Sequence, residues 1–261
     1  TLVVFAGLLW WRKPQWCSLP QAGHQMMVGF LVHACYLGGV FAAIDWALPA
    51  GVTAVIMGIQ PLLTALIGWI WLSERLRSTQ WLGLVLGLAG VLLVVSQNGQ
   101  GNADSAGWDA WAAAFIALGA ISIGTLYQKR FGGGVDLMVG AFYQYIATAV
   151  VMGLLAWQFD SGIVDWSWPL IGALAWMVLA LSVIAILLLM VMIREGEASK
   201  VASYFYLVPA LTALEAWLLF DETLNSVALV GIAVAITGVW LTVRKPRIRT
   251  AQKSGMGYDA G

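Results

Sequence analysis

The sequence predicts an all-α, polytopic membrane protein built from two inverted five-helix repeats. We expect nine membrane spans, the first of them partial, out of ten in such an arrangement. Three observations predict this fold: an apolar composition, basic residues confined to alternate loops, and a segment that recurs at a fixed offset. Hydrophobic residues make up 61% and charged residues 10% of the 261-residue chain. Soluble domains carry about 25% charged residues, so most of the surface must face a lipid bilayer.

Eight segments are apolar over about the 20 residues that a spanning helix needs. They are His24–Leu48, Ala50–Trp71, Gln80–Ser96, Trp108–Gln128, Val135–Gln158, Trp168–Ile193, Ser199–Phe220 and Ser226–Val243. A ninth apolar segment, Thr1–Trp11, is about half the length of a span. We therefore expect it to be the end of a helix whose beginning precedes Thr1.

The distribution of basic residues predicts the orientation of these spans. All 13 lysine and arginine residues fall in alternate loops or in the C-terminal tail, whereas the remaining loops carry acidic residues such as Asp45, Asp104 and Asp160. Basic loops stay in the cytoplasm, so the C-terminus is expected there and the Asp104 loop outside. The net charge is zero, and without a basic patch we expect no nucleic-acid partner.

The segment Gly51–Val95 recurs without a gap at Ser199–Val243, 148 residues later. Identical pairs include Pro61/Pro209, Thr64/Thr212, Trp69/Trp217, Glu74/Glu222, Gly83/Gly231 and Gly90/Gly238. By the charge rule the two copies cross the membrane in opposite directions, which requires an odd number of spans per repeat. We interpret residues 1–96 as the first repeat, 97–107 as an external linker, 108–243 as the second repeat and 244–261 as a cytoplasmic tail. Inverted repeats are typical of secondary transporters.

Two stretches give the repeat a family resemblance. PLLTALIGWIWLSERLRSTQWLGLVLGLAGVLLV (Pro61–Val94) and ASYFYLVPALTALEAWLLFDETLNSVALVGIAVAITGVWL (Ala202–Leu241) each contain a proline-bearing helix, a glutamate at its end and a glycine-spaced helix. They resemble the EamA-domain family of ten-helix permeases, within the drug/metabolite transporter superfamily; the first helix of that family is missing here. The resemblance implies a secondary active transporter that exports small metabolites, such as amino acids or amphipathic compounds, across a bacterial-type inner membrane.

Glu215 is an acidic residue near the middle of an apolar span. A charge at this depth costs about 2.5–3.5 kcal/mol on insertion scales. Its repeat mate is Ile67, so the fold does not require an acid there. Two interpretations remain: Glu215 exchanges a proton during transport or binds a substrate amine, or it is a protonated acid that is hydrogen-bonded to a neighbouring helix. Proton coupling is therefore a hypothesis that depends on Glu215.

Polar residues at helical spacing suggest a cavity between the two repeats. Tyr204, Thr212 and Glu215 share one helix face, and Gln60 and Thr64 share the corresponding face of the repeat mate. Because polar side chains facing lipid are disfavoured, we interpret both faces as walls of a substrate site. The alternative is that the threonines bond only their own helix backbone.

Four further polar residues inside apolar spans are candidate substrate-binding residues. His33 and Tyr36 lie three residues apart and share a helix face, Gln144 interrupts an apolar span, and Ser122 is a weaker candidate on another span. For His33, hydrogen-bonded packing is the alternative to a functional role.

Pro61 and Pro209 each remove a backbone donor in mid-helix and are expected to kink or loosen the preceding turn. A freed carbonyl would serve a substrate or a gate; curvature needed only for packing is the alternative. Small residues at three- to four-residue spacing, Gly83, Gly87 and Gly90 with Gly231, Ala235 and Gly238, allow close helix approach. They fit either an interface between the repeats or a homodimer.

Other function classes have less support in the sequence. We find no nucleotide-binding motif, metal motif or cofactor motif, and the mid-span ionisable residues Glu215 and His33 form no catalytic constellation. A membrane-embedded enzyme is therefore disfavoured, and a non-transporting scaffold stays as an alternative. Cys17 lies in a loop and Cys35 in a span, so we expect no disulfide.

Overall fold

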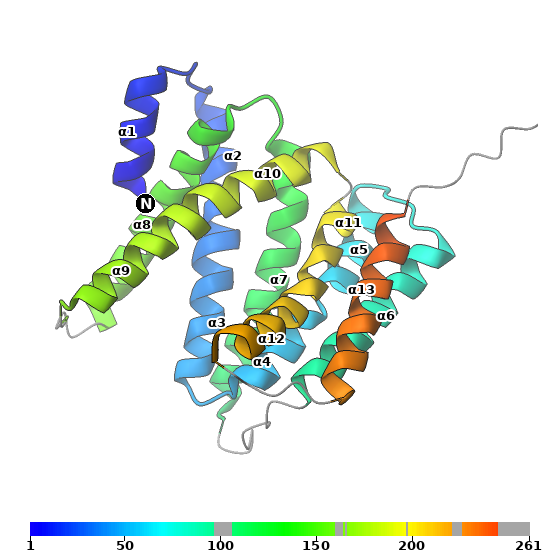
Figure 1. Ribbon diagram of the computed structural model, residues 1–261. Helices are drawn as coiled ribbons and strands as arrows, with labels where there is room; N and C mark the ends of the chain where they lie inside the picture. Colours follow the sequence, from blue (N-terminus) through cyan, green and yellow to red (C-terminus); the bar gives the residue numbers. More distant parts are fainter. Residues whose placement is uncertain (97–105, 160–163, 165, 197, 221–225, 245–261) are drawn as a thin grey trace, which may run out of the picture.

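The chain folds as an all-α polytopic membrane protein (Figure 1), as the apolar segments predict. The computed structural model describes residues 1–96, 106–159, 164, 166–196, 198–220 and 226–244, without the side chains of residues 212, 213, 215–217, 219 and 220. Within these residues, seven helices are long and apolar enough to cross a membrane. The proposed linker 97–107 and the tail 244–261 lie largely outside them.

The first half contains α1 (Leu2–Arg12), α2 (Leu19–Gly29), a π-helical segment (Phe30–Cys35), α3 (Tyr36–Asp45), α4 (Ala50–Gly58), α5 (Gln60–Trp71) and α6 (Ser78–Val95). The second half contains α7 (Trp108–Phe131), α8 (Leu137–Phe159), α9 (Trp168–Trp176), a second π-helical segment (Met177–Ala185), α10 (Ile186–Glu195), α11 (Ala198–Ser203), a 3₁₀ turn (Tyr204–Tyr206), α12 (Leu207–Phe220) and α13 (Ser226–Val243). The segments from α2 to α3 and from α9 to α10 are each one continuous span.

The α2 span begins at Leu19, five residues before the predicted start at His24. A capping box fixes this start: the Ser18 hydroxyl accepts a hydrogen bond from the backbone of Gln21, and the Gln21 side chain accepts one from the backbone of Ser18 at 3.0 Å. These bonds satisfy amides that the first helical turn leaves free. Because the first turn is polar, a search for apolar segments places the helix start too late.

Elements of the two halves correspond at the same 148-residue offset as the sequence. The offset carries both ends of α6 onto those of α13, and the start of α4 onto the start of α11. It also places the segment Phe30–Cys35 inside the segment Met177–Ala185, so both third spans contain π-helical turns at equivalent positions. The sequence repeat was visible only from Gly51 onward, and the structural correspondence extends it to the preceding span.

Both proline-bearing spans are interrupted one turn before their proline. In the first half α4 ends at Gly58 and α5 begins at Gln60, so Pro61 occupies the first turn of a new helix. In the second half a 3₁₀ turn separates α11 from α12 ahead of Pro209. Proline has no amide hydrogen and its ring clashes with the preceding turn, which explains why the break recurs at the same place.

Helices α6 and α13 pack closely against each other, and their contacts are reciprocal. A Cβ atom on Gly83 would lie 2.5 Å from the Thr242 hydroxyl, and one on Gly231 would lie 2.9 Å from Val94, which is the repeat mate of Thr242. A Cβ atom on Gly90 would likewise lie 2.4 Å from the backbone nitrogen of Ala235. A two-fold relation between the helices produces such exchanged pairs. The glycine face of α6, formed by Gly83, Gly87 and Gly90, thus packs against the other repeat. Of the two uses that the sequence left open, an interface between the repeats or a homodimer, the structure shows the first.

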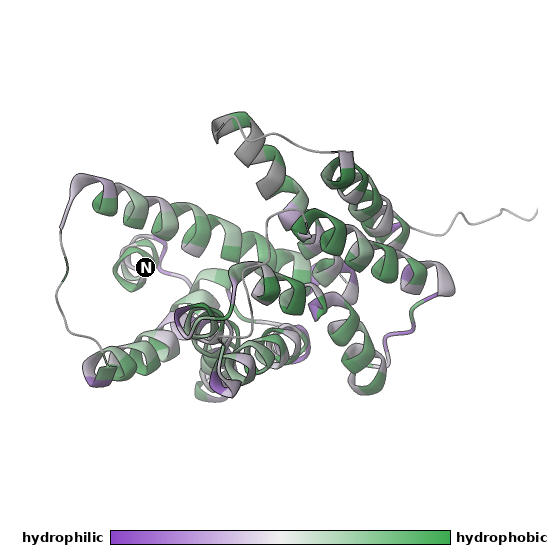
Figure 2. Cartoon of the chain, turned by 90° about the horizontal axis from the view of Figure 1, so that it is seen from below, coloured by the Kyte–Doolittle hydropathy of each residue, from purple (hydrophilic) through white to green (hydrophobic). Residues whose placement is uncertain are grey.

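The two proline-bearing spans run in opposite directions (Figure 1): one rises from α4 to α5, and the other descends from α11 to α12. Apolar residues dominate the helices, and hydrophilic residues gather at helix ends and in loops (Figure 2). The span from α9 to α10 has almost no buried residues. This distribution fits a bundle whose outer surface faces lipid.

Candidate functional site

The breaks before the two prolines border a cavity of about 140 Å³. Its walls come from α3, α4, α5 and α6 of the first half and from the 3₁₀ turn and the start of α12 of the second half. Four pairs of lining residues are repeat mates: Met57/Phe205, Gly58/Tyr206, Gln60/Val208 and Pro61/Pro209. Tyr36, Ala54 and Val91 complete the lining. The cavity therefore lies where equivalent segments of the two halves face each other.

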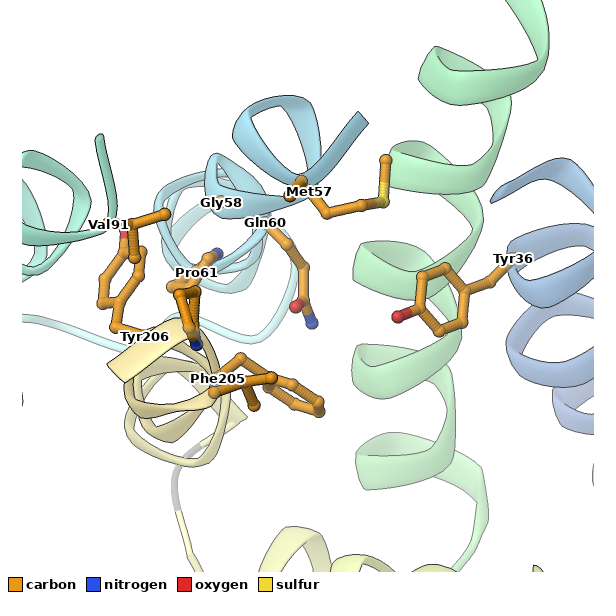
Figure 3. Close-up of a pocket in the computed structure, with 11 residues that line it drawn as sticks. Tyr36, Met57, Gly58, Gln60, Pro61, Val91, Phe205 and Tyr206 are labelled. Carbon is orange, nitrogen blue, oxygen red and sulfur yellow. The ribbon is translucent and has the colours of Figure 1, made fainter. Parts of the chain in front are cut away.

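Gln60 and Tyr36 are the polar residues directed into this cavity. Figure 3 shows the Gln60 amide and the Tyr36 hydroxyl on opposite sides of the cavity, pointing toward one another, with the Phe205 ring below them. Gln60 is 4% exposed, and its Nε2 has no hydrogen-bond partner in the structure. An unpaired buried donor costs about 1–3 kcal/mol, so this amide is poised to bond a guest molecule.

Tyr206 lines the cavity and was not among the residues that the sequence predicted. Its ring packs against α6, where a Cβ atom on Gly87 would lie 2.2 Å from the ring. The residue is 1% exposed and its hydroxyl has no partner. In Figure 3 this ring extends toward Val91, away from Gln60. Its repeat mate is Gly58, so the polar-stripe argument gave no signal for it.

Tyr204, a predicted substrate-binding residue, lies away from the cavity. It faces a separate hollow bordered by Lys129 and Lys200, and 36% of it is exposed. The prediction placed Tyr204 on the same face as Thr212 by assuming a continuous α-helix. The 3₁₀ turn at Tyr204–Tyr206 has three residues per turn, which rotates Tyr204 out of that register. The structure therefore separates Tyr204 from the cavity that Gln60 lines.

Thr64 and Ser122 are buried but lie outside the cavity lining. Both are fully buried, and neither hydroxyl has a hydrogen-bond partner in the structure. Thr64 is one turn beyond Gln60 on α5, and Ser122 is in the middle of α7. Thr212 and Glu215 belong to α12, and the positions of their side chains lie outside the described part of the chain.

Gln144 and His33 belong to a second buried group between α2, α7 and α8. The Gln144 amide donates to Gln25 Oε1 at 2.8 Å and to Gln128 Oε1 at 3.3 Å. Gln25 Nε2 and His33 Nε2 have no partner, and the His33 ring stacks on Tyr145 with centroids 4.8 Å apart. Three glutamines on three spans thus hold the first and second halves together. The sequence revealed Gln144 but not its partners, because they lie far apart along the chain.

Glu74 forms another contact between the halves, at the end of α5. Its carboxylate accepts hydrogen bonds from the backbone of Ala198 at 3.2 Å and from the Ser199 hydroxyl at 3.1 Å. These residues begin α11, where free amides attract a carboxylate. The repeat mates of Ala198 and Ser199 are Ala50 and Gly51, at the start of α4. Glu74 therefore joins α5 to the proline-bearing span of the opposite half.

The sequence profile of the EamA-like transporter family matches residues 1–96 and 110–244. The chain belongs to this family. Among its relatives, the "Uncharacterized transporter YvbV" of Bacillus subtilis is 28% identical over 82% of this chain and 69% of its own. The "Probable amino-acid metabolite efflux pump" of Escherichia coli is 26% identical over 97% of this chain and 86% of its own. The names of the EamA relatives are those of transporters, which points against an enzyme.

A solved crystal structure shares the fold of this chain. It superposes with a TM-score of 0.76 over 93% of this chain and 83% of the other, at 20% sequence identity. An inner membrane location is part of the name of another EamA relative, the "Uncharacterized inner membrane transporter YedA" of Escherichia coli, which is 29% identical over 82% of this chain and 69% of its own. This chain is a multi-pass membrane protein of the same family.

Proposed function

We propose that this protein is a secondary active transporter that exports small metabolites, such as amino acids or amphipathic compounds, by alternating access. The observation that carries the proposal is the cavity between the two proline breaks, whose walls are repeat mates. Inverted repeats place the substrate at their interface, where broken helices supply free backbone groups. The relatives named as an efflux pump and as an exporter support export as the direction.

Alternating access follows from the similarity of the two halves in sequence and in helix arrangement. When two related halves face one site, exchanging their conformations opens the site to the opposite side of the membrane. In the orientation that the basic loops predict, Glu74 and the start of α11 lie at the cytoplasmic side. We assign their hydrogen bonds as a closing contact that must separate each time the cavity opens to the cytoplasm.

The protein acts in the inner membrane of a bacterial-type cell, with its C-terminus in the cytoplasm. Its partners in this proposal are the lipid bilayer and a small-molecule substrate. Proton coupling is assigned to Glu215, because an acid inside a span is costly unless it titrates or pairs. A homodimer is not required, since the glycine face is already occupied by the other repeat.

Reconstitution into sealed vesicles tests the proposal. Purified protein is incorporated into vesicles, and uptake of radiolabelled amino acids and amphipathic compounds is compared with protein-free vesicles at several external pH values. We expect saturable flux of a compound that stays chemically unchanged, and the rate of this flux should rise when a pH gradient is imposed. The Glu215→Gln variant should keep flux but lose its dependence on the gradient. Chemical conversion of the compound would indicate an enzyme, and no flux of any compound would favour a scaffold.

A further inference from the structure

The lining of the cavity contains no charged residue among the positions that the structure describes. Charged residues such as Glu74 and Lys129 lie at or beyond helix ends. Moving an unpaired charge from water into such a cavity is costly, and the cost falls only when an opposite charge is supplied. The lining residues that the structure describes offer no such charge, so this part of the wall favours a guest without one.

Gln60 and Tyr36 are the two side chains whose hydrogen-bonding groups point into the cavity. The Gln60 amide offers two donor hydrogens and one acceptor, and the Tyr36 hydroxyl offers one donor and accepts in return. Because they face one another across the cavity (Figure 3), a polar group of a guest between them would have a hydrogen-bonding side chain on each side. An amide or a hydroxyl fits, since each donates and accepts without carrying a charge.

The rest of the wall is apolar and partly aromatic. Met57 and Phe205 flank the polar pair, and Val91 and the two prolines close the remaining sides. A methionine adapts its shape to different guests, and a ring stacks on another ring at little entropic cost. The guest therefore needs an apolar portion, aromatic or aliphatic, beside its polar group.

We propose that the cavity binds uncharged amphipathic solutes, in which one amide or hydroxyl lies between Gln60 and Tyr36 and an apolar portion lies against Phe205 and Met57. This inference rests on the proposed transport function and narrows its substrates to the uncharged class, away from zwitterionic amino acids. The side chain of Glu215 lies outside the described part of the chain, so the assignment rests on Gln60, Tyr36 and the apolar lining.

Four phenylalanine derivatives with the same side chain test this assignment. They are N-acetylphenylalaninamide (uncharged), N-acetylphenylalanine (anion), phenylalaninamide (cation) and phenylalanine (zwitterion). Binding to the purified, detergent-solubilised protein is measured by equilibrium dialysis at about pH 6, below the ordinary α-amino pKa of about 7.7–8.0. We expect the uncharged compound to bind about 10-fold more tightly than each of the others, a difference of about 1.4 kcal/mol. Equal or tighter binding of the cation, anion or zwitterion would overturn the proposal.

Variants of the polar pair test the geometry. Gln60→Leu and Tyr36→Phe should each weaken binding of N-acetylphenylalaninamide about 10-fold, because each removes one of the two hydrogen bonds. Tyr36→Phe deletes a single hydroxyl, so it remains informative should Gln60→Leu fail to fold. Thr237→Val is the matched control: Thr237 is exposed and bonds only the carbonyl of Ala233 in its own helix, so affinity should not change. Full affinity in both pair variants would refute the assignment.

Flux measurements separate this proposal from the proposed function. Radiolabelled N-acetylphenylalaninamide is followed in vesicles against the passive leak of protein-free vesicles. Binding of the uncharged compound with no protein-dependent flux of any derivative would uphold the site and contradict transport. Saturable flux of phenylalanine without binding of the uncharged compound would uphold transport and overturn the uncharged class.

Discussion

Replacement of Gly90 by alanine tests the packing on which the two-repeat arrangement depends. A Cβ atom at this position would lie 2.4 Å from the backbone nitrogen of Ala235 and 2.7 Å from the carbonyl oxygen of Gly231. Backbone atoms in the middle of α13 cannot rotate away as a side-chain end can. The two helices must therefore separate, and because they share a long reciprocal contact, separation at one point loosens packing along the pair.

Gly119→Ala supplies the matched control for the magnitude. Both glycines lie inside long helices, so both substitutions gain about 1 kcal/mol of helix propensity. Nothing lies within 4 Å of a Cβ at Gly119, whereas overpacking costs about 1–3 kcal/mol. The difference between the variants therefore isolates the clash, and Gly90→Ala should be less stable than Gly119→Ala by about 1–3 kcal/mol.

Thermal unfolding of the two variants in the same detergent, at one heating rate, measures this difference. A change of 1 kcal/mol moves the midpoint of a chain this long by about 2–4 °C, so we expect the Gly90→Ala midpoint to lie at least about 2 °C below that of Gly119→Ala. Equal midpoints would refute the close approach of α6 and α13.

Three further predictions address the other contacts. Gln144→Leu should lower the unfolding midpoint well below that of Thr237→Val, because each buried group left unpaired costs about 1–3 kcal/mol; an unchanged midpoint would mean that the amide cluster is not formed. Tyr206→Phe removes a buried hydroxyl that has no partner, so stability should stay equal or rise by up to about 1 kcal/mol, and a clear loss in the same assay would reveal a missing partner. Glu74→Ala should raise the rate at which a cysteine placed at Gln60 reacts with a membrane-impermeant maleimide from the cytoplasmic side, and an unchanged rate would contradict the closing contact.

Sequence reasoning located the seven long apolar helices of the described residues and the proline breaks, because both depend on local chemistry. Apolar length is a property of each segment alone, and proline acts on the turn before it. The sequence repeat at an offset of 148 residues likewise predicted which helices of the two halves correspond. Helix starts were less accurate: the capping box at Ser18 and Gln21 places the start of α2 among polar residues that carry no hydropathy signal.

The candidate site was predicted in part. Gln60, Tyr36, Pro61 and Pro209 line one cavity. Of these four, only Gln60 belonged to the two polar stripes that suggested a cavity. Tyr204 does not line it, because a 3₁₀ turn breaks the helical register that the prediction assumed. One local change of helix type is invisible to a periodicity argument yet moves a side chain to another face.

Partners distant in sequence could not be predicted from one chain. Gln144 was selected as a lone amide in an apolar span, whereas the structure pairs it with Gln25, 119 positions away. Glu74 was selected only as a repeated residue, and its hydrogen bonds reach the start of α11. Such pairs depend on how whole helices pack, which residue patterns along one helix do not specify.

Access to Gln60 from the two sides of the membrane tests the central claim most directly. Gln60→Cys is prepared in a background with Cys17→Ser and Cys35→Ser, and sealed vesicles of each orientation are treated with a membrane-impermeant maleimide. Alternating access predicts that the cysteine is modified from both sides, since each half of the cycle opens the cavity to one of them. Modification from one side only, or from neither, would contradict the account.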